Sequence, residues 1–190
     1  YIKKGLVQVN GITVKSPEQK VVPGKDQVSF MEKSIEAAPE FAYFLLHKPA
    51  GCVSATEDER EKTVMAYVPS SRKGLFPVGR LDKDTEGLLL ITDDGALAHR
   101  LLSPKHHVEK TYYVKTEGIV TKEDADAIAK GVDIGDEKPA LPGRIKILKT
   151  DEREGKSEVL ITIYEGRFHQ VKRMMQAVGK QVCYLKRISI

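Results

Sequence analysis

Short apolar segments of the β type recur along the chain after residue 40. Six of them predict strands of one sheet: 41–46, 88–91, 112–115, 145–148, 159–164 and 182–190. The first two are continuous apolar runs, which predict buried strands, while the others alternate in hydrophobicity. A sheet of this size needs cover on at least one face. The segments between the strands must therefore supply helices.

Three of these segments carry helix signals. The first, 96–102, follows Asp93 and Asp94, and acidic residues of this kind cap helix N-termini. The second opens at Thr121 and closes at Gly131, and the third runs over 169–178 before Gly179. The predicted fold class is α+β, with a mixed, largely antiparallel sheet and flanking helices.

The first 32 residues predict a separate small unit. An Asn-Gly pair at 10–11 lies between the alternating segments 6–9 and 12–14, which is a strong hairpin signal. A second turn at 23–26 leads into a strand at 28–30. We expect a linker over residues 33–40 and the main domain over 41–190, because the small unit cannot build an independent core.

Composition excludes several classes of protein. No run approaches the roughly 20 apolar residues that span a bilayer, and no signal peptide is visible, so we expect a cytoplasmic protein without membrane contact. Cys52 and Cys183 stand far apart, which favours two buried thiols over a disulfide or zinc site. The net charge of +4 allows a polyanionic partner without demonstrating one.

The densest polar segment lies between Gly79 and Gly87. It carries Arg80, Asp82 and further acids immediately before a predicted strand. Polar loops held by a rigid strand often bear catalytic groups. Taken alone, however, such a loop is more typical of a solvated connection.

A second cluster precedes the strand at 112–115. It contains Lys105, His106, His107 and Lys110, followed by Tyr112 and Tyr113. Neighbouring side chains of a strand face opposite sides, so only one of the two tyrosines can face a pocket. Adjacent histidines also point apart and lack a third ligand, which favours phosphate contact over a metal site.

A third cluster begins where the strand at 159–164 ends. A glycine turn leads into a helix whose first residues include Arg167, His169, Gln170, Lys172 and Arg173. The free N–H groups of a helix start favour anions, and the basic side chains extend that field. A charged, solvated helix face is the alternative.

Together these clusters resemble the motifs of a known family. Gly79–Thr92, Lys110–Tyr112 and Glu165–Met174 are similar, in content and order, to the three motifs of pseudouridine synthases of the ribosomal small-subunit type. The resemblance covers residues 41–190. It implies the pseudouridine synthase fold and isomerisation of uridine in RNA without cofactor or metal.

Two finer resemblances concern the partner. Ser103–His107 and His169–Lys172 resemble the branch that modifies 16S ribosomal RNA, free or in an assembling small subunit, while 23S RNA is the alternative. Residues 5–11 and 26–28 resemble the second half of an S4-type RNA-binding domain. We therefore expect a partial S4-like domain over 1–32, and a monomer.

The resemblance also implies roles for individual residues. Asp82 is the catalytic carboxylate, Lys172 its basic partner, and Tyr112 the tyrosine that packs on the base and handles the C5 proton. Arg80 fills the gap left by the flipped nucleotide or holds phosphate, and Leu185 packs on the site. The expected RNA contacts are Lys105, His106, His107, Lys110, Arg167, His169, Gln170 and Arg173.

Two functions of other classes remain. A non-catalytic RNA-binding or ribosome-assembly factor would share the basic surface but would not need an acid beside Arg80 and Lys172. A metal-dependent phosphoesterase would use the histidines and four acids, namely Asp82, Asp84, Asp93 and Asp94. The three-motif pattern favours the synthase over both.

Overall fold

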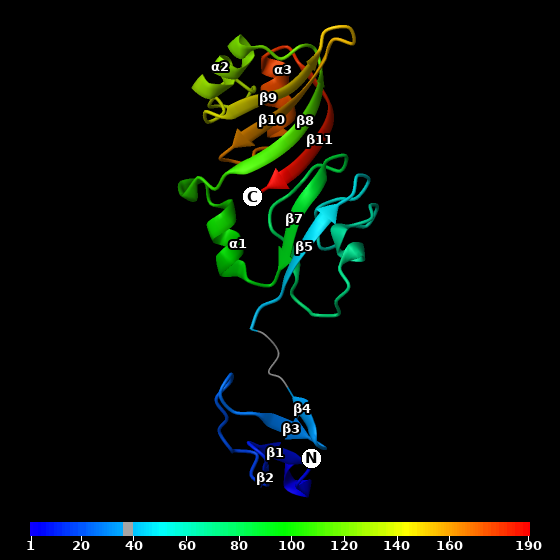
Figure 1. The fold of residues 1–190 in the computed structure, drawn as a ribbon, viewed down its shortest axis with the longest axis vertical. Helices are drawn as coiled ribbons and strands as arrows, with labels where there is room; N and C mark the ends of the chain where they lie inside the picture. Colours follow the sequence, from blue (N-terminus) through cyan, green and yellow to red (C-terminus); the bar gives the residue numbers. More distant parts are fainter. Residues whose placement is uncertain (36–39) are drawn as a thin grey trace. The chain divides into compact units, whose positions relative to one another are not determined.

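The computed structural model describes residues 1–35 and 40–190, which divide into two compact units, Tyr1–Glu40 and Phe41–Ile190 (Figure 1). The first unit contains the short helix η1 (Ile2–Lys4) and a four-stranded sheet in the order β2-β1-β3-β4. Its strands are β1 (Val7–Val9), β2 (Ile12–Val14), β3 (Val28–Phe30) and β4 (Lys33–Ile35).

The predicted Asn-Gly hairpin is confirmed. Asn10 and Gly11 connect β1 to β2 with φ angles of 52° and 80°, the left-handed conformation that a two-residue hairpin turn requires. The Asn10 side chain also donates to Asp26 at 2.9 Å and accepts from the Gln27 amide at 2.9 Å. These hydrogen bonds connect the turn at residues 10–11 to the turn at residues 23–26.

The linker expected over 33–40 differs from the structure at its start. Lys33–Ile35 form β4, which pairs with β3 and extends the sheet. Residues 36–39 of the expected linker lie outside the described residues. The three strand residues were assigned to a linker because they show no apolar period of their own. In the structure, pairing with the neighbouring strand β3 holds them in the extended conformation.

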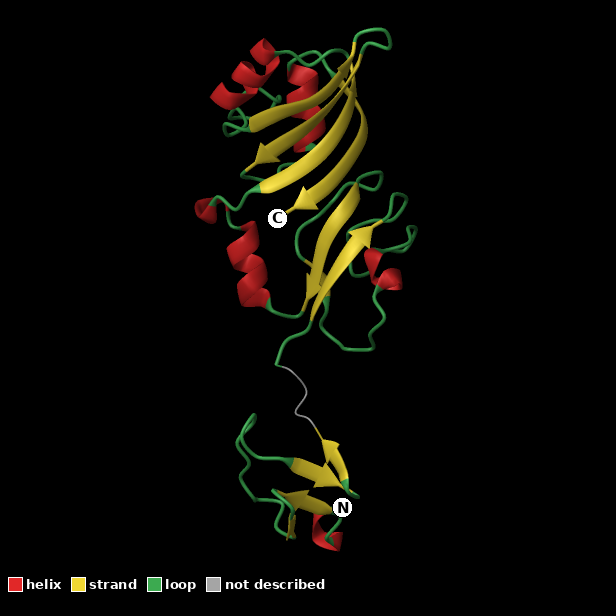
Figure 2. Ribbon diagram, viewed as in Figure 1, coloured by secondary structure: helices red, strands yellow, loops and turns green. Residues whose placement is uncertain are grey.

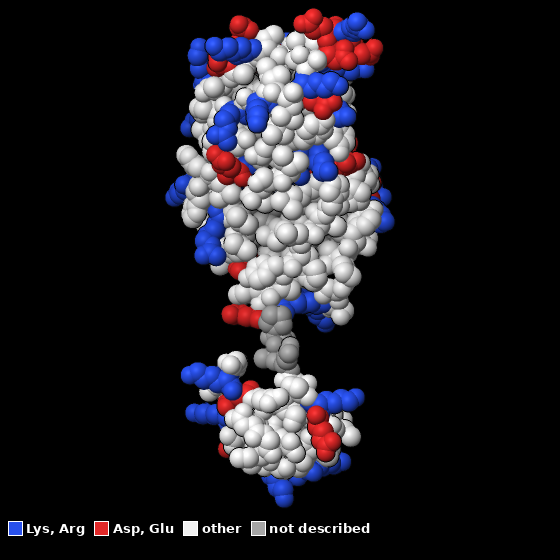
Figure 3. Space-filling model, in the orientation of Figure 1, with Lys and Arg blue, Asp and Glu red and all other residues white. Residues whose placement is uncertain are grey.

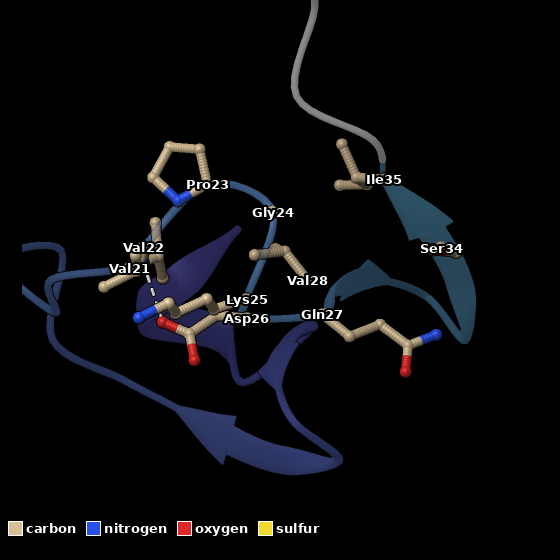
Figure 4. A pocket seen from close by; sticks show the side chains of 10 residues that line it. All are labelled: Val21, Val22, Pro23, Gly24, Lys25, Asp26, Gln27, Val28, Ser34 and Ile35. Atoms are coloured by element: carbon tan, nitrogen blue, oxygen red, sulfur yellow. Dashed lines mark hydrogen bonds between the residues drawn. The ribbon is translucent and has the colours of Figure 1, made fainter.

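An open groove of about 450 Å³ lies in this first unit (Figure 4). Residues 21–28, Ser34 and Ile35 line it, and among these described residues Lys25 and Asp26 are charged. The Val22 amide donates to the Asp26 carboxylate at 2.7 Å, which shapes the turn. None of the three predicted clusters of functional residues contributes to this groove.

The second unit contains one seven-stranded sheet (Figure 2). Its strands are β5 (Tyr43–Lys48), β6 (Phe76–Pro77), β7 (Glu86–Thr92), β8 (Lys110–Glu117), β9 (Arg144–Asp151), β10 (Lys156–Ile163) and β11 (Gln181–Ser189). Its helices are η2 (Val64–Tyr67), α1 (Gly95–Leu102), η3 (Pro104–His106), α2 (Lys122–Lys130) and α3 (Gln170–Ala177). All six predicted strands and all three predicted helices are present.

The strand order is β5-β7-β11-β8-β10-β9, with β6 paired to β7. β7 and β11 are parallel, and the other neighbours are antiparallel. The predicted α+β class with a mixed, largely antiparallel sheet is therefore confirmed. The parallel pair brings the beginning of β7, which follows Asp82, beside the end of β11.

The sheet buries one face more completely than the other. On β8, Tyr112 and Val114 are buried and face the core with Ile161 and Leu185 of the neighbouring strands. Helix α2 packs on β9 and α3 packs on β11. Tyr113 and Tyr184, on the other face, line an open groove. The expectation that only one of Tyr112 and Tyr113 faces inward is confirmed.

Two sequence expectations about burial were wrong. The segment 41–46 was predicted to be a buried strand, but β5 is an edge strand on which Leu45 is 75% exposed. On the face drawn in Figure 3, the middle of this unit shows few Lys, Arg, Asp or Glu side chains. Cys183 is exposed on the open face of β11, whereas Cys52 is buried. An apolar run reports hydrophobicity and does not reveal which strands lie at an edge.

Among the described residues, no helix is long and apolar enough to cross a membrane.

Candidate active site

The loop that carries Asp82 lies between β6 and β7. Hydrogen bonds to its backbone N–H and C=O groups hold it in place. The Ser54 hydroxyl accepts from the Leu81 amide and donates to the Leu81 carbonyl, both at 3.0 Å. The Thr85 amide donates to the Asp82 carbonyl at 3.1 Å. These bonds fix the backbone on both sides of Asp82.

Lys48 is the second support of this loop. Its ammonium is fully buried and donates to the carbonyls of Pro49 at 3.1 Å, Lys83 at 3.2 Å and Thr85 at 2.8 Å. Burial lowers the pKa of Lys48, and the carboxylates of Asp84 and Asp82 are among the groups that oppose this shift. A buried cation thus lies beneath the loop and favours negative charge above it.

Asp82 is paired with Lys172, as the sequence led us to expect. The Lys172 Nζ atom lies 3.2 Å from Asp82 Oδ2, and both side chains are about one-quarter exposed. The same ammonium lies closer to Asp84, at 2.7 Å and 2.8 Å from its two oxygens. One cation therefore serves two carboxylates, and Asp84 holds it more tightly in the free protein.

The two ion pairs shift the pKa values in opposite directions. Burial lowers the pKa of Lys172, but the carboxylates of Asp84 and Asp82 outweigh it and raise the pKa above 10.5. The hydrogen bond from Lys172 lowers the pKa of Asp84 below 3.8. Lys172 is consequently a fixed positive charge at neutral pH.

His169 approaches Asp82 from the other side. Its Nε2 atom lies 3.6 Å from Asp82 Oδ1, and its ring stacks on Phe168 with centroids 3.8 Å apart. His169 has a φ of 47° and forms the N-cap of α3, so the expected helix begins one residue later than predicted. The left-handed turn directs this ring toward the carboxylate.

Tyr112 lies in the pocket beside Asp82. Burial raises the pKa of the Tyr112 hydroxyl, while the neighbouring Arg187 guanidinium opposes that shift. Arg187 is 2% exposed, and its Nε atom donates to the Leu88 carbonyl at 2.8 Å. A phenol with a raised pKa is protonated at neutral pH and is therefore a weak base unless its surroundings change.

One pocket gathers most of the predicted site residues. Its lining comes from the Asp82 loop, β8, the end of β10, the start of α3 and β11. The lining residues are Arg80, Leu81, Asp82, Thr85, Tyr112, Ile163, Gly166, Arg167, His169, Gln170, Val171 and Leu185. Lys172 is not among these lining residues, but its ammonium pairs with Asp82, which is. Leu185, which is 6% exposed, forms part of its apolar wall.

Arg167 and Arg173 were expected to contact RNA, but both are engaged within the protein. Arg173 donates to the Ile134 and Phe168 carbonyls, each at 2.9 Å, and pairs with Asp136. Arg167 bonds Glu165 and the carbonyls of residues 138 and 139. The two guanidinium groups fasten the segment that precedes β9 to α3.

Gln170 and Lys110 are also more enclosed than expected. Gln170 is 3% exposed and donates to Glu165 at 2.8 Å, which stabilises the turn before α3. Lys110 is 5% exposed and donates to the Val108 carbonyl at 3.1 Å. Burial, aided by Arg187, lowers the pKa of Lys110. Both side chains are largely buried, and Gln170 also lines the pocket.

Four of the expected RNA contacts keep accessible polar groups. Lys105 and His106 lie in η3 and are exposed, as is His107, which has a φ of 48°. Arg80 lines the pocket and is exposed as well. Within the described residues, no group of three or more potential ligands is arranged to hold a metal ion.

Sequence reasoning missed several residues that shape the site: Lys48, Ser54, Thr85 and Arg187. A lysine at the end of an apolar strand, directly before Pro49, was a signal for Lys48, since lysines are rarely found in such places without a function. Asp84 was treated as one acid among several. Only the fold shows that it shares Lys172 with Asp82.

Comparison with known proteins agrees with this geometry. The model of the RNA pseudouridylate synthase family matches residues 42–177. An RNA pseudouridine synthase of Bacillus subtilis, itself uncharacterised, is 42% identical over all of this chain and 79% of its own length. The chain therefore belongs to the RNA pseudouridine synthase family, in the branch typified by the ribosomal small-subunit enzymes.

Two further relatives carry more specific names. Ribosomal large subunit pseudouridine synthase B of Bacillus subtilis is 41% identical, covering 98% of this chain and 75% of the relative. Ribosomal small subunit pseudouridine synthase A of Escherichia coli K12 is 40% identical, covering 98% and 78%. A crystal structure of a pseudouridylate synthase superimposes with a TM-score of 0.70 at 38% identity, covering 98% and 78%.

Proposed function

We propose that this protein converts one specific uridine of 16S ribosomal RNA to pseudouridine, with Asp82 as the catalytic carboxylate. The observation that carries the proposal is the pairing of Asp82 with Lys172 inside a pocket that Tyr112 also lines. This placement joins a carboxylate, a cation 3.2 Å away from it and an aromatic side chain that can pack on a base. The substrate is the RNA alone or an assembling small subunit, in the cytoplasm, and the enzyme acts as a monomer.

The chemistry requires little more than these groups. The C1′–N1 bond of the uridine breaks, the uracil rotates, and a C1′–C5 bond forms. The C5 proton then passes to solvent and N1 takes up a proton, so the product is an isomer of uridine. Asp82 either attacks C1′ or removes the C2′ proton, and its ionised form is needed in both cases. The nucleotide must leave its stack to reach Asp82, which costs a few kcal/mol. Arg80 at the rim then fills the gap or holds a phosphate.

Release of tritium from RNA that carries [5-³H]uridine tests this proposal. Asp82→Asn keeps the size of the side chain but removes its charge, so we expect a loss of turnover of at least about a thousandfold with RNA binding retained. Asp126→Asn is the matched control, because Asp126 is exposed on α2 and its loss changes the net charge equally. Full turnover by Asp82→Asn would refute the assignment.

The 23S RNA is the second candidate substrate, since the large-subunit relative is as similar as the small-subunit relative. The amino-acid sequences of segments 103–107 and 169–172 resemble the branch that modifies 16S RNA, which supports 16S RNA as the substrate. Tritium release from separate 16S and 23S transcripts, followed by mapping of pseudouridine in cells with and without the gene, distinguishes the two. Release from 23S RNA alone would replace our proposal with the second candidate.

A further inference from the structure

Thr85 has a buried hydroxyl group that no described residue contacts by a hydrogen bond. The residue is 1% exposed, and its Oγ1 atom has no partner in the described part of the chain. A buried polar group that lacks a partner is unfavourable by about 1–3 kcal/mol, so such groups are uncommon in folded proteins. This one lies three residues after Asp82, which calls for an explanation.

The backbone of Thr85 is rigidly held. Its amide donates to the Asp82 carbonyl at 3.1 Å, and its carbonyl accepts from the buried Lys48 ammonium at 2.8 Å. The side chain lines the pocket together with Asp82 and Tyr112. A β-branched residue on a fixed backbone has few accessible rotamers. The hydroxyl is thus held in place without serving a bond within the protein.

We propose that the Thr85 hydroxyl forms a hydrogen bond to the flipped nucleoside in this pocket and so acts as a substrate-positioning group. Its bond is completed only when the substrate enters. The partner is a polar group of the nucleoside, either the ribose 2′-hydroxyl or a uracil heteroatom. This inference rests on the proposed function. It goes further by giving Thr85 a substrate contact that neither the motifs nor the ion pairs require.

Thr92 provides an internal comparison. Thr92 is the last residue of β7, whereas Thr85 directly precedes this strand. Thr92 is fully buried, and its hydroxyl accepts a hydrogen bond from the Asp94 amide at 3.0 Å. The Thr92 hydroxyl is therefore used by the fold, and the Thr85 hydroxyl is not. The same Thr→Val change at the two positions should have opposite consequences.

Thr85→Val, Thr85→Ser and Thr92→Val in the full chain test the proposal. In Thr85→Val the shape is kept but the hydroxyl is lost, so we expect kcat/KM for tritium release to fall about tenfold. Its Tm should equal or exceed that of the wild type, because an unpaired polar atom is removed. Thr85→Ser should stay within about threefold of the wild-type kcat/KM. Thr92→Val should instead lower the Tm and leave kcat/KM unchanged below its transition.

The wild-type protein separates this inference from the proposed function. If wild-type protein releases no tritium from any RNA, the proposed function fails. If it is active and Thr85→Val is equally active, or if Thr85→Val lowers the Tm as Thr92→Val does, Thr85 has no substrate role. A Thr85→Ser variant as impaired as Thr85→Val would also exclude the hydrogen bond.

Binding to RNA with a 2′-deoxy target nucleotide identifies the partner group. If the hydroxyl contacts the ribose, Thr85→Val and wild type should bind this RNA equally, while differing on the all-ribose RNA. If it contacts the base, the difference between the two proteins should persist on both RNAs. Either result supports the inference, and equal binding of both proteins to both RNAs overturns it.

Discussion

At the scale of the residue, two carboxylates share the ammonium of Lys172. It contacts Asp84 at 2.7 Å and 2.8 Å and Asp82 at 3.2 Å, although Asp84 is 72% exposed and Asp82 only 24%. Solvent screens the exposed pair more strongly. The longer contact to Asp82 is therefore expected to matter more for function.

Lys172→Met and Asp84→Asn should separate the two contacts. Loss of the ammonium removes the nearest positive charge from the Asp82 carboxylate and leaves the His169 ring at 3.6 Å beside it, so we expect tritium release to fall by about a hundredfold in Lys172→Met. Asp84→Asn leaves Lys172 with Asp82 alone, and activity should stay within about fivefold of the wild type. Equal damage by both substitutions would contradict this division and give Asp84 a direct role.

The pKa shifts set the pH range of this ion pair. The folded pKa of Asp84 is depressed, so its contribution is complete above 3.8 and is lost as the pH falls through the lower folded value. The folded pKa of Lys172 is raised, so its contribution is complete below 10.5 and is lost at still higher pH. Between these two pH limits both groups stay charged. The ratio of Lys172→Met activity to wild-type activity, measured by tritium release, should therefore not change with pH through this ion pair.

At the scale of the element, the contact between β7 and β11 restricts Gly87. A Cβ atom at this position would lie 2.1 Å from the Arg187 carbonyl oxygen, and the φ angle of Gly87 is +105°. The close approach allows the parallel pairing of Gly87 with Arg187, shortly after the loop that carries Asp82. Glycine is needed here for both space and conformation.

Gly87→Ala should therefore destabilise the second unit by at least about 3 kcal/mol, through the clash with the neighbouring backbone and the unfavourable φ. Urea unfolding followed by circular dichroism measures this change. Gly95→Ala is the control, because no atom lies within 4 Å of its added Cβ at the start of α1. Similar stabilities of the two variants would show that β7 and β11 can separate at little cost.

The elements also show how far the sequence could predict the site. The capping pattern around Thr121 gave the correct helix α2, and the structure contains the reciprocal bonds between Thr121 and Asp124. Arg173 was interpreted as a phosphate ligand because a basic helix start attracts anions. Its partners Asp136 and Ile134 lie 37 and 39 residues away along the chain. No local pattern reveals such partners.

At the scale of the whole molecule, the core and the candidate site both belong to the unit Phe41–Ile190. No described residue of the first 40 is buried. A unit that buries so little contributes little hydrophobic stabilisation. We infer that residues 41–190 determine stability and chemistry, and we propose that residues 1–32 are a partial S4-like RNA-binding domain that adds affinity.

A protein containing residues 41–190 alone tests this division. It should unfold in one transition within a few degrees of the full chain, as judged by calorimetry, because the core is unchanged. Its kcat should be close to that of the full chain, while its RNA affinity should be lower and less sensitive to salt. Equal affinity and equal salt dependence would remove the RNA-binding role of the first unit.

The sequence by itself determined the strands, the helices, the hairpin turn and the three motifs, because hydrophobic period, capping and turn chemistry act over a few neighbouring residues. Only the tertiary structure decided that Lys172 also pairs with Asp84, 88 residues away, and that Lys48 supports the loop of Asp82. It also decided that Lys110 is buried and that Thr85 is left without a partner. Burial and pairing depend on which distant segments meet, and that is a property of the assembled sheet.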